Sequence, residues 1–254
     1  GNSLCGIITD STNTFNNIYV VLYSIDSLTS LFTPIDTTTV NPNGVYCFNN
    51  LLPGVYAVLA YPFIVATPSN TSSGYIPTYY GNVIYWTGAN LIYLNSNSTA
   101  FYNISLSSFS NTSPSNGPGN IGGNVVSTLP KALDSENPYE NLLIFLLDAN
   151  NNNPLMFTFS DANGGFMFNN IALGEYKIHP ELPGLTAIPA TVVLDENNTD
   201  NFKVLITVSG TNIEASVPAM HETLSGYISD VYPNPTSSDA YININGNIKI
   251  TYIE

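Results

Sequence analysis

Short runs of β-branched and aromatic residues recur roughly every ten residues along the chain, as in residues 18–23, Ile-Tyr-Val-Val-Leu-Tyr. The Asn-Gly pairs Asn43-Gly44 and Asn163-Gly164 are typical of hairpin turns between such runs. Helix formers are scarce, since arginine and glutamine are absent and Lys and Glu are rare, whereas Asn, Thr, Tyr and Val are common. The pattern predicts an all-β protein built from β-sandwiches.

An internal repeat is the most informative feature of the pattern. Residues 43–58, Asn-Gly-Val-Tyr-Cys-Phe-Asn-Asn-Leu-Leu-Pro-Gly-Val-Tyr-Ala-Val, align without gaps on residues 163–178, Asn-Gly-Gly-Phe-Met-Phe-Asn-Asn-Ile-Ala-Leu-Gly-Glu-Tyr-Lys-Ile. Each copy predicts a turn, a short strand with alternating aromatics, a tight glycine corner and a second strand with a tyrosine. The matching upstream and closing strands are expected at residues 17–23, 141–147, 101–106 and 202–208. Two homologous β domains therefore lie in tandem.

The repeat and the Ser/Asn/Gly/Pro-rich stretches give the domain organisation. Residues 74–98 have no counterpart in the second copy and hold the only tryptophan, so they form an insertion. We expect a first sandwich at 1–109 with this insertion, a linker at 110–120, a second sandwich at 121–209, a linker at 210–226 and a partial third β segment at 227–254.

Composition and charge exclude several classes of function. The chain has a net charge of −14 and only 4 basic residues, all lysines, so it lacks the cationic surface that nucleic acid binding requires. No apolar run approaches the roughly 18 residues of a membrane span. No nucleophile with a paired base is recognisable, so we expect no enzyme activity. Because the chain begins on a predicted strand without a signal peptide, we expect a mature product or part of a longer chain.

The sequence allows two kinds of covalent cross-link, a disulfide and an isopeptide bond. Cys5 and Cys47 both occupy strand-like positions, so they either form one disulfide or remain two buried thiols. The acid- and amide-rich composition favours an exported protein, in which a disulfide persists. A Lys-to-Asn isopeptide bond would need a buried lysine beside an acid, and the candidates are Lys177 and Lys203.

The block Asn43-Gly44-Val45-Tyr46-Cys47-Phe48-Asn49-Asn50-Leu51-Leu52-Pro53-Gly54-Val55-Tyr56 resembles the carboxypeptidase regulatory-like domains, which are also described as transthyretin-like. The second copy is similar from Ile121 onward. This resemblance implies a seven-stranded, transthyretin-like or Ig-like β-sandwich that serves as a spacer or adhesion module in secreted proteins. It implies little about a specific activity.

Near the other end, Val231-Tyr232-Pro233-Asn234-Pro235-Thr236 resembles the opening of the C-terminal sorting domain of cargo exported by the type IX secretion system of Bacteroidetes. The sorting signal itself would be Tyr232, Pro233, Asn234 and Pro235. The resemblance implies export by the type IX machinery to the cell surface. In proteins of that phylum, Asp-Ser/Thr triplets are O-glycosylated, which makes Ser11, Ser27 and Thr37 the candidate sites.

Oxygen-rich loops provide the candidate metal ligands. Asp148, Asn150, Asp161 and Asn163 carry the oxygen ligands that Ca²⁺ prefers. Asp and Asn are also the residues that turns require, so plain turn chemistry is the alternative. The sequence predicts no other cofactor.

Aromatic residues of the insertion also have two interpretations. The rings of Tyr79, Tyr80 and Trp86 either stack on sugars or pack the insertion onto the sandwich. Packing is favoured because Ile76, Val83 and Ile84 alternate with the aromatics as in a core.

These features together predict an extracellular structural or adhesive module, part of a stalk, filament or surface adhesin. Self-association through open strand edges, other surface proteins, and glycans are the expected partners. The alternative is a carbohydrate-binding accessory region of a larger secreted enzyme.

Overall fold

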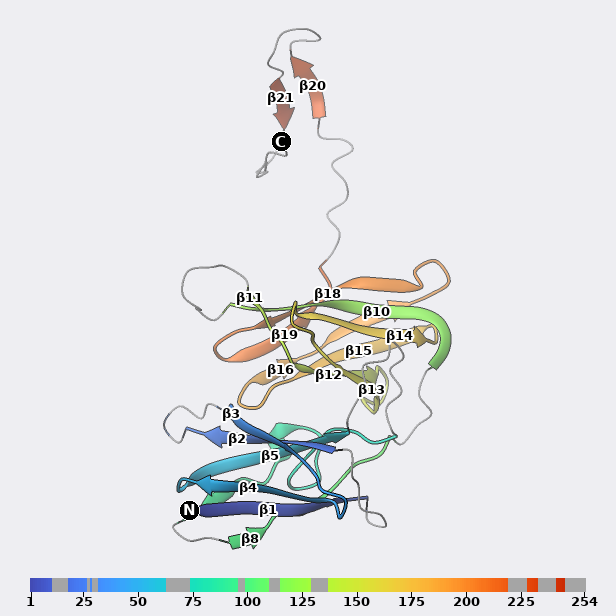
Figure 1. The fold of residues 1–254 in the computed structure, drawn as a ribbon. Coiled ribbons are helices and arrows are strands. Elements are labelled where there is room, and N and C mark those ends of the chain that lie inside the picture. Colours follow the sequence, from blue (N-terminus) through green and yellow to red (C-terminus); the bar gives the residue numbers. More distant parts are fainter. Residues whose placement is uncertain are drawn as a thin grey trace. The chain divides into compact units, whose positions relative to one another are not determined.

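The structure is a computed structural model that describes residues 1–10, 18–26, 28, 32–62, 74–95, 99–109, 115–128, 137–218, 228–232 and 241–244. It contains two compact units, Gly1–Val217 and Pro218–Glu254. Strands make up nearly all regular structure in the described residues, and one short 3-10 helix, η1 (Trp86–Gly88), accompanies them (Figure 1). The prediction of an all-β sandwich protein is therefore confirmed.

The first sandwich consists of two sheets. One sheet has the order β4-β1-β8, with β9 also paired to β1, and the other has the order β3-β2-β5-β6, with β7 also paired to β5. The strands are β1 (Asn2–Thr9), β2 (Ile18–Ile25), β3 (Phe32–Thr39), β4 (Val45–Leu51), β5 (Gly54–Pro62), β6 (Thr78–Tyr79), β7 (Ile92–Leu94), β8 (Thr99–Phe101) and β9 (Ile104–Ser105).

The second sandwich repeats this plan. One sheet has the order β11-β10-β18-β19-β16, with β14 paired to β10, and it faces a sheet with the order β13-β12-β15-β17. The strands are β10 (Ser115–Ser127), β11 (Asn137–Pro138), β12 (Leu143–Asp148), β13 (Pro154–Phe159), β14 (Gly165–Ile171), β15 (Gly174–Glu181), β16 (Thr186–Ile188), β17 (Ala190–Leu194), β18 (Asp200–Val208) and β19 (Asn212–Ser216).

The second compact unit contains one antiparallel pair, β20 (Ile228–Tyr232) and β21 (Tyr241–Ile244). Tyr232 pairs with Tyr241 in this ladder.

The internal repeat is visible in matching details of the two sandwiches. Strands β4 and β5 correspond to β14 and β15, and Asn50 and Asn170 both adopt left-handed backbone conformations, with φ of 58° and 56°. At each corner a tyrosine hydroxyl donates to a carbonyl four residues upstream. The Tyr56 hydroxyl donates to the Leu52 carbonyl at 2.7 Å, and the Tyr176 hydroxyl donates to the Ala172 carbonyl at 2.8 Å.

The Asn-Gly turns differ from the prediction, because neither forms a β-hairpin. Gly44 and Gly164 both have φ of 76°, as such tight turns need, but each turn joins strands of opposite sheets. The side chains of Asn41 and Asp161 fix these crossings by accepting two backbone N–H bonds each, at 2.8–3.0 Å. These side-chain bonds add to the backbone bonds within each turn, where the Asn41 N–H donates to the Val45 carbonyl and the Asp161 N–H to the Gly165 carbonyl.

Strands reach into both predicted linkers. Strand β10 begins at Ser115, because Gly117 and Gly119 let its backbone approach β14 more closely than any side chain would permit. Strand β19 lies at Asn212–Ser216, where Ile213 and Ala215 are buried in the second core. The extent of the two repeats, 1–109 and 121–209, remains our proposal.

The closing strand of the first sandwich is split. The pattern predicts one strand at residues 101–106, whereas β8 and β9 are separated at Tyr102 and Asn103. The carbonyl oxygen of Tyr102 lies where a Cβ on Gly6 would be, so a glycine at this position is required for the close approach. Asn103 Oδ1 compensates by accepting the Ile7 N–H at 2.9 Å.

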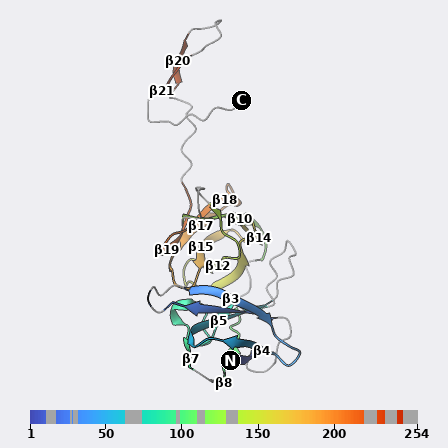
Figure 2. The same ribbon diagram turned by 60° about the vertical axis from the view of Figure 1, so that its left-hand side comes forward.

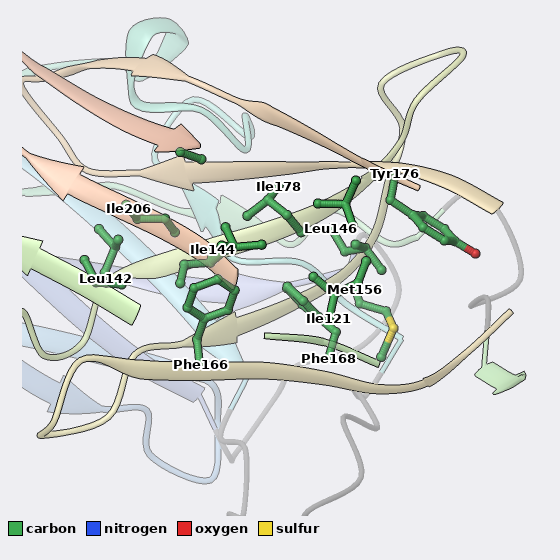
Figure 3. Packing of buried hydrophobic residues seen from close by; sticks show 14 of the residues in the cluster. Ile121, Leu142, Ile144, Leu146, Met156, Phe166, Phe168, Tyr176, Ile178 and Ile206 are labelled. Atoms are coloured by element: carbon green, nitrogen blue, oxygen red, sulfur yellow. The ribbon is translucent and has the colours of Figure 1, made fainter. Parts of the chain in front are cut away.

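Each sandwich encloses its own apolar core. Alternate residues of facing strands fill both cores, as the burial pattern of β1, with every second side chain buried, illustrates. Figure 3 shows the core of the second sandwich, where Ile144 and Leu146 of β12 meet Phe166 and Phe168 of β14.

Candidate functional site

The two sandwiches pack face to face through the outer surfaces of two sheets. The sheet containing β2, β3 and β5 lies next to the sheet containing β12 and β15 (Figures 1 and 2). Between them lies an interface cluster of buried residues from both sandwiches: Leu59, Ile76, Tyr79, Leu143, Phe145, Leu147 and Phe157. Residues 1–217 thus form one compact unit rather than two independent domains.

Strand β12 shows why the contact forms. Leu142, Ile144 and Leu146 point into the core of the second sandwich, as does each alternate position of a strand. Leu143, Phe145 and Leu147 point the other way, into the interface cluster. A strand that is apolar on both faces must be covered on both faces.

The insertion of the first sandwich attaches to the second sandwich by directed hydrogen bonds. The backbone N–H of Trp86 donates to Glu181 Oε1 at 2.7 Å, and its indole N–H donates to the Leu185 carbonyl at 2.9 Å. The ring of Tyr85 lies edge-on to Phe145, with centroids 6.0 Å apart, and 4.8 Å from the His179 ring. These contacts fix the relative position of the two sandwiches.

A buried polar cluster surrounds Glu181. This residue is only 3% exposed, and its Oε2 lies 3.6 Å from His179 Nε2. Among the described residues, Tyr79 Oη and His179 Nε2 are buried without a hydrogen-bond partner. Burial raises the pKa of Tyr79 well above its usual value of 10, and the charge of Glu181 raises it further. The pKa of Tyr85 is raised by the same two causes.

A cleft of about 700 Å³ opens beside this cluster and is lined by both sandwiches. Its walls include several aromatic rings, among them Tyr61 and Phe159, whose ring centroids are 5.0 Å apart. Among the described lining residues, Glu140 and Glu181 are the only charged ones, and none is basic. The lining combines Tyr19, Tyr23, Phe32, Thr37, Leu59, Tyr61 and Tyr79 with Tyr139, Glu140, Leu143, Phe159, Glu181 and Leu185.

The aromatic candidates of the insertion all make packing contacts in the structure, and glycan binding by them stays a prediction. Tyr79 is fully buried, so its ring cannot stack on a sugar in this structure. Tyr80 is partly buried against the first core, with its ring edge-on to Tyr102 at 5.4 Å. Trp86 is held by its two cross-sandwich bonds and lies 5.2 Å from Phe32 between ring centroids.

The candidate calcium ligands lie in two separate turns. Asp148 and Asn150 belong to the β12–β13 turn and Asp161 and Asn163 to the β13–β14 turn, so the whole of β13, about 20 Å, separates them. Asp148 Oδ1 accepts the Asn150 N–H at 2.8 Å, which is turn chemistry. Among the described residues, no three His, Cys, Asp or Glu side chains gather around a common point. Calcium binding stays a prediction, and an unchanged melting temperature after addition of a chelator would contradict it.

The cysteines form a disulfide. Cys5 and Cys47 are directly opposite each other on β1 and β4, and their sulfurs are bonded. The isopeptide interpretation finds no suitable lysine, because Lys203 is exposed and Lys177 is half-buried. The ammonium of Lys177 instead donates to Asn152 Oδ1 at 2.7 Å on the surface.

Some of the candidate glycosylation and sorting residues lie outside the residues that the structure describes. Thr37 is exposed on β3, with its N–H bonded to Asp36 Oδ1 at 2.8 Å, and its glycosylation stays a prediction. Ser11 and Ser27 lie outside the described residues, as do Pro233, Asn234 and Pro235. Tyr232 is the last residue of β20.

The sequence pattern missed the interface and the buried Glu181. One signal was present: residues 142–147, Leu-Leu-Ile-Phe-Leu-Leu, form an unbroken apolar run, which is typical of a strand covered on both faces. Nothing in the pattern marks Glu181, since its burial depends on a loop almost a hundred residues away.

Comparisons with known proteins yield only distant structural similarity. No protein-family model matches the chain, and no curated protein matches it. A streptococcal ancillary pilin is 12% identical, with a TM-score of 0.31 over 85% of this chain, and the match spans 62% of that pilin's length. The minor pilin GBS52 of Streptococcus agalactiae is 11% identical, with a TM-score of 0.28 over 88% of this chain and all of its own.

An (S)-allantoin synthase gives a similar score, 0.30, at 16% identity over 42% of this chain and 46% of its own. Such low scores carry no argument about function. Separately, no described helix has the length and apolar character needed to cross a bilayer.

Proposed function

We propose that the chain is an extracellular structural or adhesive module, part of a stalk, filament or surface adhesin. The observation that carries the proposal is the shared interface cluster, which joins two sandwiches into one stiff block. A spacer or load-bearing element gains from such stiffness, because bending between the domains would require separating a packed apolar interface.

Two further features support an extracellular location. The disulfide between Cys5 and Cys47 is stable in oxidising compartments and rare in the cytosol. The chain has only 4 basic residues in 254, so it offers few cleavage sites to trypsin-like proteases.

Labelling of intact cells tests this proposal. An antibody against the purified protein should label the outside of unpermeabilised source cells, and electron microscopy should show the labelled structures. Labelling only after permeabilisation would contradict the extracellular role. If the purified protein stays monomeric and forms no fibres, the filament version fails, whereas the spacer version survives.

We further propose that export follows the type IX route, on the resemblance of Tyr232, Pro233, Asn234 and Pro235 to its sorting domains. A reporter fused to residues 218–254 should reach the surface of a bacterium with this machinery. Replacing Pro233 and Pro235 by alanine should retain the reporter inside the cell, and unchanged export would contradict the assignment.

The alternative, a carbohydrate-binding accessory region, depended on exposed rings in the insertion. The structural role is preferred because Tyr79 is fully buried and Trp86 is hydrogen-bonded across the interface, whereas glycan binding by Tyr80 and Trp86 stays a prediction.

A further inference from the structure

The cleft between the sandwiches joins apolar walls to a strong negative charge in its lining. Tyr61 and Phe159 form part of the walls, and the buried residue Glu181, which interacts with Tyr79, also lines the cleft. Its volume of about 700 Å³ falls within the range of small-molecule and side-chain binding sites. This combination selects a ligand with an apolar stem and a positive end.

Among the described residues, no lysine pairs with the carboxylate of Glu181. In the part of the chain that the structure describes, its one ion-pair partner is the imidazole of His179, at 3.6 Å, and no other ion pair is formed there. Lys177 is bonded to Asn152, and the chain contains no arginine. A buried carboxylate without a cation is costly, so an external cation would be bound favourably there.

The hydroxyl of Tyr79 supplies an independent sign of a ligand. This side chain is 0% exposed and lines the cleft, and Tyr79 Oη makes no hydrogen bond of standard geometry, although a weaker contact with the neighbouring Glu181 carboxylate contributes to its raised pKa. A buried polar group without a partner is rare in folded proteins, and at a binding site a ligand provides the missing bond. An ammonium group carries three donors, enough for Glu181 and Tyr79 together.

We propose that the cleft binds an alkylammonium group, whose charge pairs with the Glu181 carboxylate and whose N–H donates to Tyr79 Oη, while its stem packs against the aromatic walls. Cation–π attraction from the tyrosine rings adds to the binding. The same chemistry is present in a lysine side chain of a partner protein and in a free alkylamine. The inference is independent of the structural role proposed above.

Calorimetry and Trp86 fluorescence on the full chain test the proposal. Suitable probes are n-hexylamine and an acetylated, amidated Gly-Lys-Gly peptide, each with a neutral counterpart, n-hexanol and the norleucine peptide. The ammonium probes should bind at least roughly 10-fold more tightly than the neutral ones, because a charge-assisted bond contributes more than apolar contact alone. Equal binding of the neutral probes, or no binding of either ammonium probe, would overturn the proposal.

The two ammonium probes distinguish the sources of the ligand. Binding of the peptide identifies a protein side chain as a ligand that the cleft accepts, whereas binding of n-hexylamine alone identifies a free amine. Each of these outcomes supports an alkylammonium site.

Variants then locate the site. Glu181→Gln keeps the side-chain size and the acceptor for Trp86, yet it should weaken ammonium binding roughly 10- to 100-fold. Glu175→Gln is the matched control, since Glu175 is exposed on the same strand, and it should leave binding unchanged. Tyr79→Phe should weaken binding several-fold without loss of folding. Unchanged affinity in both Glu181→Gln and Tyr79→Phe would contradict the assignment of the site.

Discussion

The backbone N–H of Trp86 in the first sandwich donates a 2.7 Å hydrogen bond to the buried carboxylate of Glu181 in the second. This bond crosses between two domains that the repeat pattern predicts as separate units. The insertion that carries Trp86 has no counterpart in the second copy, so the duplicated halves differ at the place where they meet. The interface therefore depends on the insertion that only the first sandwich carries, and not on the sequence that the two sandwiches share.

Replacing Trp86 by alanine should weaken this interface. The change removes the indole bond to Leu185 and the ring contact with Phe32, and we expect a loss of about 3 kcal/mol in the free energy of unfolding. Calorimetry should show one transition for the natural chain and two for the variant, because the sandwiches no longer unfold together.

Phe101→Ala is the matched control for this experiment. Phe101 is an aromatic residue that is 71% exposed, so its removal should change stability by no more than about 0.5 kcal/mol. A single transition at the natural temperature in Trp86→Ala would contradict the shared-interface model.

The sandwich fold could be predicted from sequence because it rests on local features. Alternating burial, the left-handed residues Asn50 and Asn170 and the corner tyrosines each depend on a few neighbouring positions, and these recur in both copies. The turns were misread as hairpins because Asn41 and Asp161 direct the chain to the opposite sheet by side-chain bonds. The Asn-Gly pair alone does not determine whether the chain forms a hairpin or crosses to the opposite sheet.

The candidate site could not be predicted in the same way. Glu181 is the last residue of β15, where nothing in the sequence distinguishes it from an exposed strand end, and its burial results from contact with the insertion. Long-range packing of this kind leaves no periodic signal in one sequence. Only the apolar run of β12 indicated that a second face of the sheet would be covered.

The disulfide should contribute strongly to the stability of the first sandwich. It closes a loop with a sequence separation of 42 residues. Loop entropy then predicts a loss of about 4 kcal/mol when both Cys5 and Cys47 are replaced by alanine. Urea unfolding measures this loss, and chemical reduction of the natural chain should reproduce it. Equal urea midpoints for the oxidised chain and the double variant would contradict the prediction.

Alkaline pH should destabilise the protein through its buried tyrosines. Burial raises the pKa values of Tyr46 and Tyr79 above the usual 10, so the folded state holds these protons more tightly than the unfolded state. Their contribution is fully present below pH 10 and is lost as the pH rises from 10 through the folded pKa values. Each such tyrosine lowers stability by up to about 1.4 kcal/mol per pH unit in this window.

Urea midpoints at several pH values between 8 and 11 measure this effect. Tyr46→Phe should make the fall above pH 10 shallower, because one of the titrating groups is gone. A stability that is flat from pH 8 to pH 11 would contradict the prediction.

Tyr79→Phe should stabilise the ligand-free protein, even though the side chain is fully buried. The ring keeps its packing, whereas a buried hydroxyl that makes no hydrogen bond of standard geometry is removed, so the free energy of unfolding should rise by about 1 kcal/mol. Tyr46→Phe is the matched control, because the Tyr46 hydroxyl donates to the Tyr102 carbonyl at 2.6 Å and its loss should lower stability by a similar amount. Urea unfolding at pH 7 distinguishes the two signs. A destabilised Tyr79→Phe would show that the hydroxyl is already satisfied, whereas a stabilised variant with weaker ammonium binding would show that it is kept for a ligand.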